Sequence, residues 1–129
     1  MTDFTTFKLE VTDGVAVATF SRPEQMNTFS PTMMLEMLEL FDITDADDAV
    51  KAVIVTGSGR AFCAGADLAQ GGDTFNYNRR DASEQIMVNG IRRDGGGRVS
   101  LRIYQSLKPV IAAVNGAAVG VGATMQLPM

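Results

Sequence analysis

The chain has 129 residues, a formal net charge of −4 and 46% apolar residues. The length suffices for the core of one ordinary domain, and the acidic balance disfavours a protein that binds nucleic-acid phosphates over a broad surface. No apolar stretch approaches the roughly 20 residues needed to span a bilayer. The first residues also lack the basic and then apolar pattern of a signal sequence, so we expect no membrane partner and a cytoplasmic location.

One cysteine and no histidine limit the available chemistry. Cys63 has no partner for a disulfide within the chain and no imidazole to activate it, so we expect a small buried thiol. The absence of histidine excludes a Ser-His-Asp triad and a Cys/His metal cluster in this chain. The aspartates do not follow the spacing of a calcium loop, and no metal site is predicted.

The first predicted elements are a β-hairpin and a helix. Apolar residues alternate over 7–11 and over 15–19 with Asp13-Gly14 between them, which predicts a hairpin with a two-residue turn. Ser30-Pro31 then supplies an N-cap and a first-turn proline. Apolar residues follow at helical spacing, namely Met34, Met37, Leu38 and Phe41. We interpret the methionines as core filling and not as a cofactor site.

Two β-branched apolar runs predict buried strands that lead into loops of small residues. Ala52–Thr56 ends in a glycine-rich turn, and Val110–Val114 begins after Lys108-Pro109 and ends in Asn115-Gly116. A helix is expected to start near residues 120–122, where its first N–H groups would favour an anion or a developing oxyanion. Glycines after strands also serve tight turns or close packing, so neither segment alone establishes a site.

The remaining segments predict loops and two further helices. The acidic residues before the first buried strand predict a solvated loop, and they are Asp42, Asp45, Asp47 and Asp48. Residues 71–80 are polar and contain glycine, which predicts a mobile surface loop. A capping box at Asp81 predicts a helix that reaches about Arg93, and Gly95-Gly-Gly97 is expected to break it. A second helix is predicted over 98–107.

Three ordered motifs resemble the crotonase superfamily, which comprises the enoyl-CoA hydratases and isomerases. Arg22-Pro-Glu-Gln-Met-Asn27 is similar to the early Arg-Pro-x-x-x-Asn segment of that family. Phe62–Leu68 resembles its first oxyanion loop, and Lys108–Gly116 resembles the entry to its second. The resemblance spans residues from about 7 to 129 and implies an α/β fold of repeated ββα units wound as a spiral. Periodicity alone leaves other α/β folds open.

Domain organisation follows from the same resemblance. No tandem repeat or composition shift marks a boundary, so we predict one crotonase-like domain over residues 1–129. Family domains are considerably longer, so we expect the N-terminal portion of the fold, from a truncated or split polypeptide. The resemblance also implies a homotrimer or a hexamer of trimers.

The resemblance implies an oxyanion hole for a thioester carbonyl, formed by the backbone N–H groups of Ala66 and Val121. Family members commonly carry glycine at the second position. Val121 still supplies an N–H, although its branched side chain narrows the pocket. The remaining substrate-binding positions implied by the resemblance are Arg22, Gln25, Met26, Ala64, Asp67, Leu68 and Gly120.

Two of these side chains have alternative interpretations. Arg22 is either a charge that faces the phosphates of coenzyme A or a solvent-exposed arginine before a proline turn. Asp67 is interpreted as the cap of a helix that begins near Leu68, in preference to a proton-transfer group.

The second loop also bears on the reaction. Hydratases of this family carry a glutamate where this chain has Thr124, and hydration ordinarily draws on two carboxylates. The Gly-Val-Gly-Ala-Thr arrangement resembles the peroxisomal-type enoyl-CoA isomerases, which move a double bond from the β,γ to the α,β position with one carboxylate. We expect that carboxylate beyond Met129. The implied function is an acyl-CoA enzyme that favours isomerisation and uses no cofactor, because coenzyme A is part of its substrate.

There are two alternatives to an acyl-CoA enzyme, of which only the first remains open. One is a noncatalytic crotonase-fold module that binds a CoA ligand or only assembles with partners. The other, a dinucleotide-binding domain, is disfavoured because Gly120-Val-Gly122 supplies only the front of a G-x-G-x-x-G pattern and no Gly-Lys-Ser/Thr phosphate loop occurs.

Overall fold

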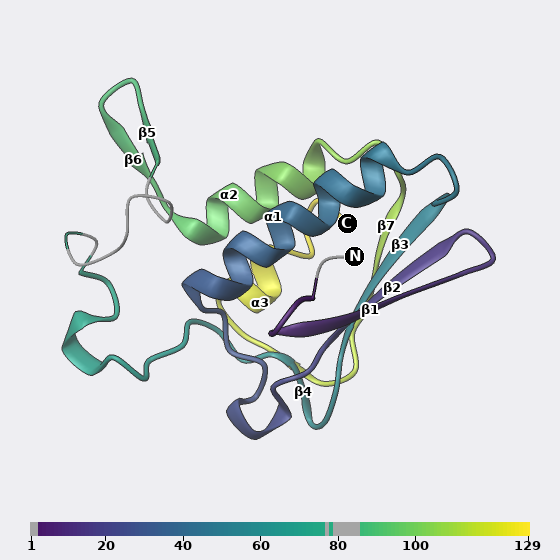
Figure 1. Cartoon of the computed structure of the whole chain (residues 1–129). Coiled ribbons are helices and arrows are strands. Elements are labelled where there is room, and N and C mark those ends of the chain that lie inside the picture. The colour runs from purple at the N-terminus through teal and green to yellow at the C-terminus, as the bar shows by residue number, and fades with distance from the viewer. Residues whose placement is uncertain (1–2, 77, 79–85) are drawn as a thin grey trace.

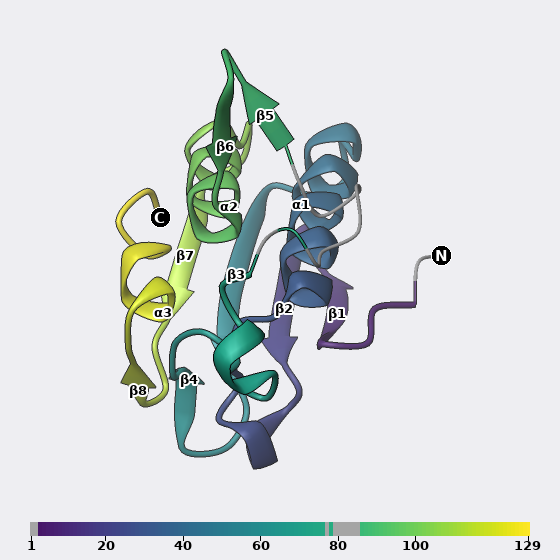
Figure 2. The ribbon, with the colours of Figure 1, turned by 90° about the vertical axis from the view of Figure 1, so that its left-hand side faces the viewer.

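The computed structural model describes residues 3–76, 78 and 86–129 and confirms the predicted α/β organisation. Two helices lie side by side over one face of a four-stranded sheet, whose order is β1-β2-β3-β7 (Figures 1 and 2). The elements of these layers are β1 Phe7–Thr12, β2 Val15–Phe20, α1 Pro31–Ala46, β3 Ala52–Gly57, α2 Gly95–Tyr104 and β7 Val110–Ala113. The smaller elements are η1 Pro23–Gln25, β4 Ala61–Cys63, η2 Gly71–Asp73, β5 Ile86–Val88, β6 Ile91–Arg93, β8 Ala117–Ala118 and α3 Val121–Thr124.

The sheet begins with the predicted hairpin and continues with parallel strands. Asp13 and Gly14 both have positive φ angles, 52° and 82°, as a tight two-residue hairpin turn requires. β2 then pairs in parallel with β3, and β3 with β7. Parallel neighbours need a long crossover, and α1 lies in the first of these connections and α2 in the second.

The core lies between the sheet and the two helices. α1 begins as predicted, because the Ser30 hydroxyl accepts a hydrogen bond from the Met33 N–H at 3.2 Å and Pro31 occupies the first turn. The interpretation of the methionines as core residues is confirmed for Met34 and Met37, which are at most 1% exposed. The other fully buried large side chains come from both layers, from β4 and from the C-terminal end of α3, and include Phe7, Phe20, Met33, Leu40, Phe41, Phe62, Ile103 and Met125.

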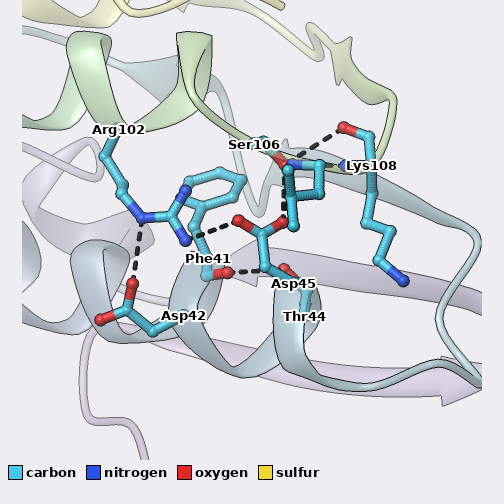
Figure 3. Close-up of polar contacts among 8 residues, drawn as sticks. Phe41, Asp42, Thr44, Asp45, Arg102, Ser106 and Lys108 are labelled. Carbon is cyan, nitrogen blue, oxygen red and sulfur yellow. Dashed lines mark hydrogen bonds and ion pairs between the residues drawn. The ribbon is translucent and has the colours of Figure 1, made fainter.

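An ion-pair cluster joins the C-terminal halves of α1 and α2 (Figure 3). The Arg102 guanidinium donates to Asp42 at 3.0 Å and to Asp45 at 2.7 Å. Asp45 also accepts hydrogen bonds from the Ser106 hydroxyl and from the Leu107 N–H. Burial alone would raise the pKa of the Asp45 carboxyl, but these hydrogen bonds and the Arg102 charge lower the pKa below its usual value.

The structure corrects several expectations about secondary structure. Asp42 and Asp45 belong to α1 and bind Arg102, so they are not part of a solvated loop. Residues 86–93 form the β5–β6 hairpin in place of a helix, and Asn89 and Gly90 adopt the positive φ angles of its turn. The rest of that predicted helix, residues 81–85, lies outside the described residues.

The predicted glycine break is also wrong, since α2 starts at Gly95 and ends at Tyr104. Its N-cap is Asp94, whose carboxylate accepts from the Gly97 N–H at 2.7 Å, and this cap outweighs the low helix propensity of the three glycines. Of the loop predicted over 71–80, residues 71–73 form the short helix η2, and residues 77, 79 and 80 are outside the described residues.

None of the helices described within residues 3–76, 78 and 86–129 is long and apolar enough to cross a bilayer.

The ion-pair cluster around Arg102 predicts that Asp45 and Asp42 contribute unequally to the stability of the protein. Asp45→Asn should lower the free energy of unfolding at pH 7 by about 1–3 kcal/mol, because it weakens several charged hydrogen bonds. Asp42 is 73% exposed, so the matched change Asp42→Asn should cost less than about 1 kcal/mol. Urea denaturation of both variants measures the difference, and equal losses would contradict the prediction.

The same carboxylate gives a pH dependence. The pKa of Asp45 is lower in the folded than in the unfolded state, so its contribution is fully present above the unfolded value of about 4 and disappears as pH falls through the folded value. Asp45→Asn and the unaltered protein should therefore converge in stability under acid conditions.

Candidate functional site

The two loops that follow β3 and β7 are joined by a short parallel pairing of β4 with β8. The Val119 N–H donates to the Cys63 carbonyl at 3.0 Å. Gly116 and Gly122 permit this approach, because a Cβ at either position would overlap a carbonyl oxygen, that of Arg60 or that of Cys63 respectively. The second loop is therefore in backbone contact with the first.

Ala66 lies in the first loop opposite Phe29. The Phe29 N–H donates to the Gly65 carbonyl at 2.7 Å, and the Asp67 N–H donates to the Phe29 carbonyl at 2.8 Å. In such a parallel bridge the intervening residue directs its own N–H away from the partner. The Ala66 N–H consequently points away from Phe29.

Val121 is the first residue of α3, and its N–H has no partner within the helix. Gly120 precedes it with φ 56°, and a Cβ on Gly120 would lie 3.9 Å from Gly65 Cα, so the two loops approach closely here. Within the described part of the chain, neither the Ala66 N–H nor the Val121 N–H donates a hydrogen bond.

Ala66 and Val121 line one cavity of about 360 Å³. Its apolar wall includes Phe29, Pro31, Met34 and Phe75, and its polar lining includes Ser30, Asp67, Gln70, Thr74 and Asp94. A mainly apolar pocket with a few polar groups is typical of a small-molecule site. Two unpaired backbone donors in such a pocket can stabilise a carbonyl oxygen that gains negative charge.

The other predicted site residues divide into two groups. Asp67 and Gly120 line the cavity with the two donors, whereas five residues are outside its lining, namely Arg22, Gln25, Met26, Ala64 and Leu68. Leu68 is 64% exposed. The Ala64 N–H donates to the Met26 carbonyl at 3.1 Å, so these two residues connect the early segment to the first loop.

Arg22 reaches the cavity only through Asp67. Its guanidinium donates to Asp67 at 2.9 Å, to the Thr28 carbonyl at 3.1 Å and to the Gln25 side chain. The side chain is 20% exposed, so the alternative of a solvent-exposed arginine is wrong.

The helix expected to begin near Leu68 is absent from the described residues 68–70. Asp67 therefore caps no helix there, and its carboxylate instead accepts a hydrogen bond from the Ala69 N–H at 2.9 Å.

The sequence interpretation missed the start of α2 as a wall of the cavity. Asp94, Gly95 and Gly96 all line it, and a Cβ on Gly96 would lie 2.9 Å from Val121 Cγ2. The glycines therefore leave room for the branched side chain of Val121. Asp94 followed by three glycines was available as a helix N-cap signature, but its place beside Val121 depends on the tertiary structure.

Cys63 is fully buried, as predicted, and burial raises the pKa of its thiol. Its backbone carbonyl accepts the hydrogen bond from Val119 that joins the two loops. The raised pKa of the thiol disfavours the reactive thiolate. Among the residues that the structure describes, no group of three or more His, Cys, Asp or Glu side chains could hold a metal ion.

The contact between the loops predicts a sharp difference between two glycines. Gly122→Ala should destabilise the protein by about 2 kcal/mol or more, because the new methyl group would overlap the Cys63 carbonyl. Gly72→Ala is the matched control, since a Cβ there would have no neighbour within 4 Å. Thermal unfolding of both variants tests this; a Gly122→Ala protein as stable as the control would show that the loops are not in close contact.

Comparisons with known proteins agree with this architecture. The family model for enoyl-CoA hydratase/isomerase matches residues 10–128. The chain is 41% identical over 117 residues to enoyl-CoA hydratase AKT3-2 of Alternaria alternata, covering 91% of this chain and 36% of that protein. It is 37% identical over 125 residues to 1,2-epoxyphenylacetyl-CoA isomerase of Escherichia coli, covering 91% of this chain and 42% of that protein.

The solved structure of a monofunctional enoyl-CoA isomerase from M. smegmatis superposes with a TM-score of 0.70 at 31% identity, covering 95% of this chain and 46% of that one. The chain thus spans less than half the length of each of these three proteins. The matching family model, these similarities and the shared fold lead to one conclusion: the chain belongs to the enoyl-CoA hydratase/isomerase family, and it corresponds to the N-terminal part of the crotonase fold.

Proposed function

We propose that this chain supplies the thioester-binding part of an acyl-CoA enzyme, with Ala66 and Val121 as the two donors to the substrate carbonyl. The observation that supports the proposal is that Ala66 and Val121, the two residues with unpaired N–H groups, line one largely apolar cavity. Donation to the carbonyl would stabilise the enolate formed when a proton leaves the neighbouring carbon. Coenzyme A is part of the substrate, and no further cofactor is proposed.

We further propose that double-bond isomerisation is favoured over hydration. Isomerisation needs one carboxylate that removes a proton from C2 of a β,γ-enoyl group and returns it to C4 of the dienolate. Hydration ordinarily uses a second carboxylate to activate water. The exposed hydroxyl of Thr124 is directed toward the Val121 carbonyl at 3.5 Å and is a poor substitute for that group. Relatives of both kinds occur, a hydratase and isomerases, so the family alone does not decide the reaction.

Binding of the coenzyme A phosphates would need either a cationic side chain other than Arg22 or a rearrangement that frees Arg22. Because Arg22 is paired with Asp67, a direct contact with phosphate would compete with that ion pair. We therefore propose that Arg22 mainly orders the first loop around Asp67. Assembly into a homotrimer or a hexamer of trimers in a cytoplasmic setting remains part of this proposal.

A noncatalytic CoA-binding module is the second candidate. Both carboxylates that line the cavity, Asp67 and Asp94, already accept hydrogen bonds from backbone N–H groups of their own segments. In that case acyl-CoA would bind at Ala66 and Val121 without turnover.

Binding can be tested directly with a thioester labelled with ¹³C at its carbonyl. In the full-length protein we expect a downfield shift of the bound carbonyl signal, because two N–H donors polarise it. Ala66→Pro removes one donor and should reduce both this shift and turnover, the latter by about 10²–10³-fold. Ala66→Gly, which keeps the N–H, separates the loss of the donor from the loss of the methyl group, and circular dichroism checks the fold of each variant. A bound carbonyl with an unperturbed signal would remove the oxyanion assignment.

The reaction preference has its own assay. The full-length protein should convert a β,γ-enoyl-CoA to the α,β isomer faster than it hydrates an α,β-enoyl-CoA. Thr124→Glu should raise the hydration rate, because it adds a carboxylate at the last residue of α3, while Thr124→Gln controls for size. Hydration by the unaltered protein that matches isomerisation would overturn this preference, and binding without either reaction would favour the noncatalytic module.

A further inference from the structure

Two asparagines hold the turn between β3 and β4 from different parts of the chain. Asn27 comes from the segment after β2, and Asn115 follows β7. Both side-chain amides donate to the Ala61 carbonyl, Asn27 Nδ2 at 2.9 Å and Asn115 Nδ2 at 3.1 Å. A carbonyl oxygen has two lone pairs, so this pair of donors saturates it.

The rest of each amide is also engaged with backbone atoms. Asn27 accepts from the Arg22 N–H at 2.9 Å and donates to the Ser58 carbonyl at 3.0 Å. Asn115 accepts from the Gly57 N–H at 3.0 Å and donates to the Gly59 carbonyl at 3.1 Å. Flipping either amide would place its oxygen against carbonyl oxygens, so the network determines the orientation of both.

Gly57 makes room for this arrangement. A Cβ at that position would lie 2.8 Å from Asn115 Oδ1 and 3.0 Å from Asn27 Nδ2. Asn27 itself is 1% exposed and has a left-handed φ of 53°, a conformation that asparagine tolerates better than most residues. The backbone conformation of the turn and the positions of the two side-chain amides that bind it are therefore tightly defined.

The held turn leads directly into the two donor loops. Ala61 is the first residue of β4, which continues through Cys63 into the loop that carries Ala66. Asn115 is the residue from which the second loop runs to Val121. The Asn115 amide therefore joins the start of the second loop to the Ala61 carbonyl, and the Asn27 amide holds the same oxygen from the early segment.

We propose that Asn27 and Asn115 are positioning residues, which hold the Ala66 and Val121 N–H groups in the geometry needed to share one carbonyl oxygen. This inference rests on the proposed function. Neither asparagine lines the cavity, so both act through the backbone. Two N–H donors that must converge on one oxygen tolerate little displacement. The two asparagines should therefore affect turnover more than substrate binding.

The test is Asn115→Asp in the full-length protein. The change keeps the size of the side chain and an acceptor for Gly57, but it removes the donors and places oxygen near the Ala61 and Gly59 carbonyls. We expect kcat to fall by about 10–100-fold while KM for acyl-CoA changes less than about threefold. The ¹³C shift of the bound thioester carbonyl should decrease in parallel with kcat.

Thr56→Val is the matched control. It removes the hydrogen bond from the Thr56 hydroxyl to the Ala113 carbonyl at 2.7 Å, which joins β3 to β7 beside the turn without bonding to it. It should leave the bound carbonyl signal and kcat unchanged. If Asn115→Asp does not fold, Asn115→Ser, which retains one hydroxyl donor, takes its place with an intermediate loss expected.

Three results would overturn the proposal in different ways. An unchanged kcat and carbonyl shift in the folded Asn115 variant would show that the amide does not position the donors. If kcat falls in both the Asn115 variant and Thr56→Val, and each fall follows the decrease in that variant's melting temperature, Asn115 has a purely structural role. An unaltered protein that neither polarises the carbonyl nor turns over acyl-CoA would overturn the proposed function, and this inference with it.

Discussion

The close approach of the second loop to β4 is the constraint on which the site depends. β8 and α3 can lie against β4 only because residues 116 and 122 have no side chain, so that the Arg60 and Cys63 carbonyls come into contact with the opposing backbone. Any Cβ at these positions would push the loops apart. Ala66 and Val121, whose N–H groups are unpaired, would then no longer line the same cavity.

The helices position the remaining walls of that cavity. The Arg102 ion pairs join α1 and α2 through their C-terminal halves, while the start of each helix reaches the site, Pro31 in α1 and Gly95 in α2. Val121 begins α3 at the same place. Helix N-termini carry partial positive charge, which favours the development of negative charge in the space between them. The Asp94 carboxylate offsets part of this effect for α2 because it caps that helix.

The chemistry proposed for the site uses backbone atoms and therefore tolerates sequence change. A valine at position 121 supplies the same N–H as a glycine, provided that its side chain has space, and Gly96 provides that space. Side chains instead determine how accurately the backbone is held, through Asn27 and Asn115 at the turn and through Arg22 and Asp67 at the first loop. This division is consistent with the occurrence of both hydratases and isomerases among the proteins that this chain resembles.

The sequence by itself determined the elements whose causes are local. Asp13-Gly14 specifies a hairpin turn and Ser30-Pro31 a helix start, and the spacing of Met34 and Met37 specifies a buried helix face. The three motifs also identified the family and the loops that carry Ala66 and Val121, because short backbone motifs have recognisable compositions.

Only the tertiary structure decided features that depend on distant partners. In β2 both alternating sets are mainly apolar, so the pattern could not show that Ala16, Ala18 and Phe20 form the buried set. Asp45 appeared suited to a solvated loop until Arg102, 57 residues away, paired with it. The glycines at the start of α2 appeared to end a helix, yet the Asp94 cap and the lack of space beside Met34 and Val121 place them inside one. The Asp94 cap is a local signal, but the other deciding contacts join residues far apart in the chain, and such contacts leave no periodic or local pattern in a single sequence.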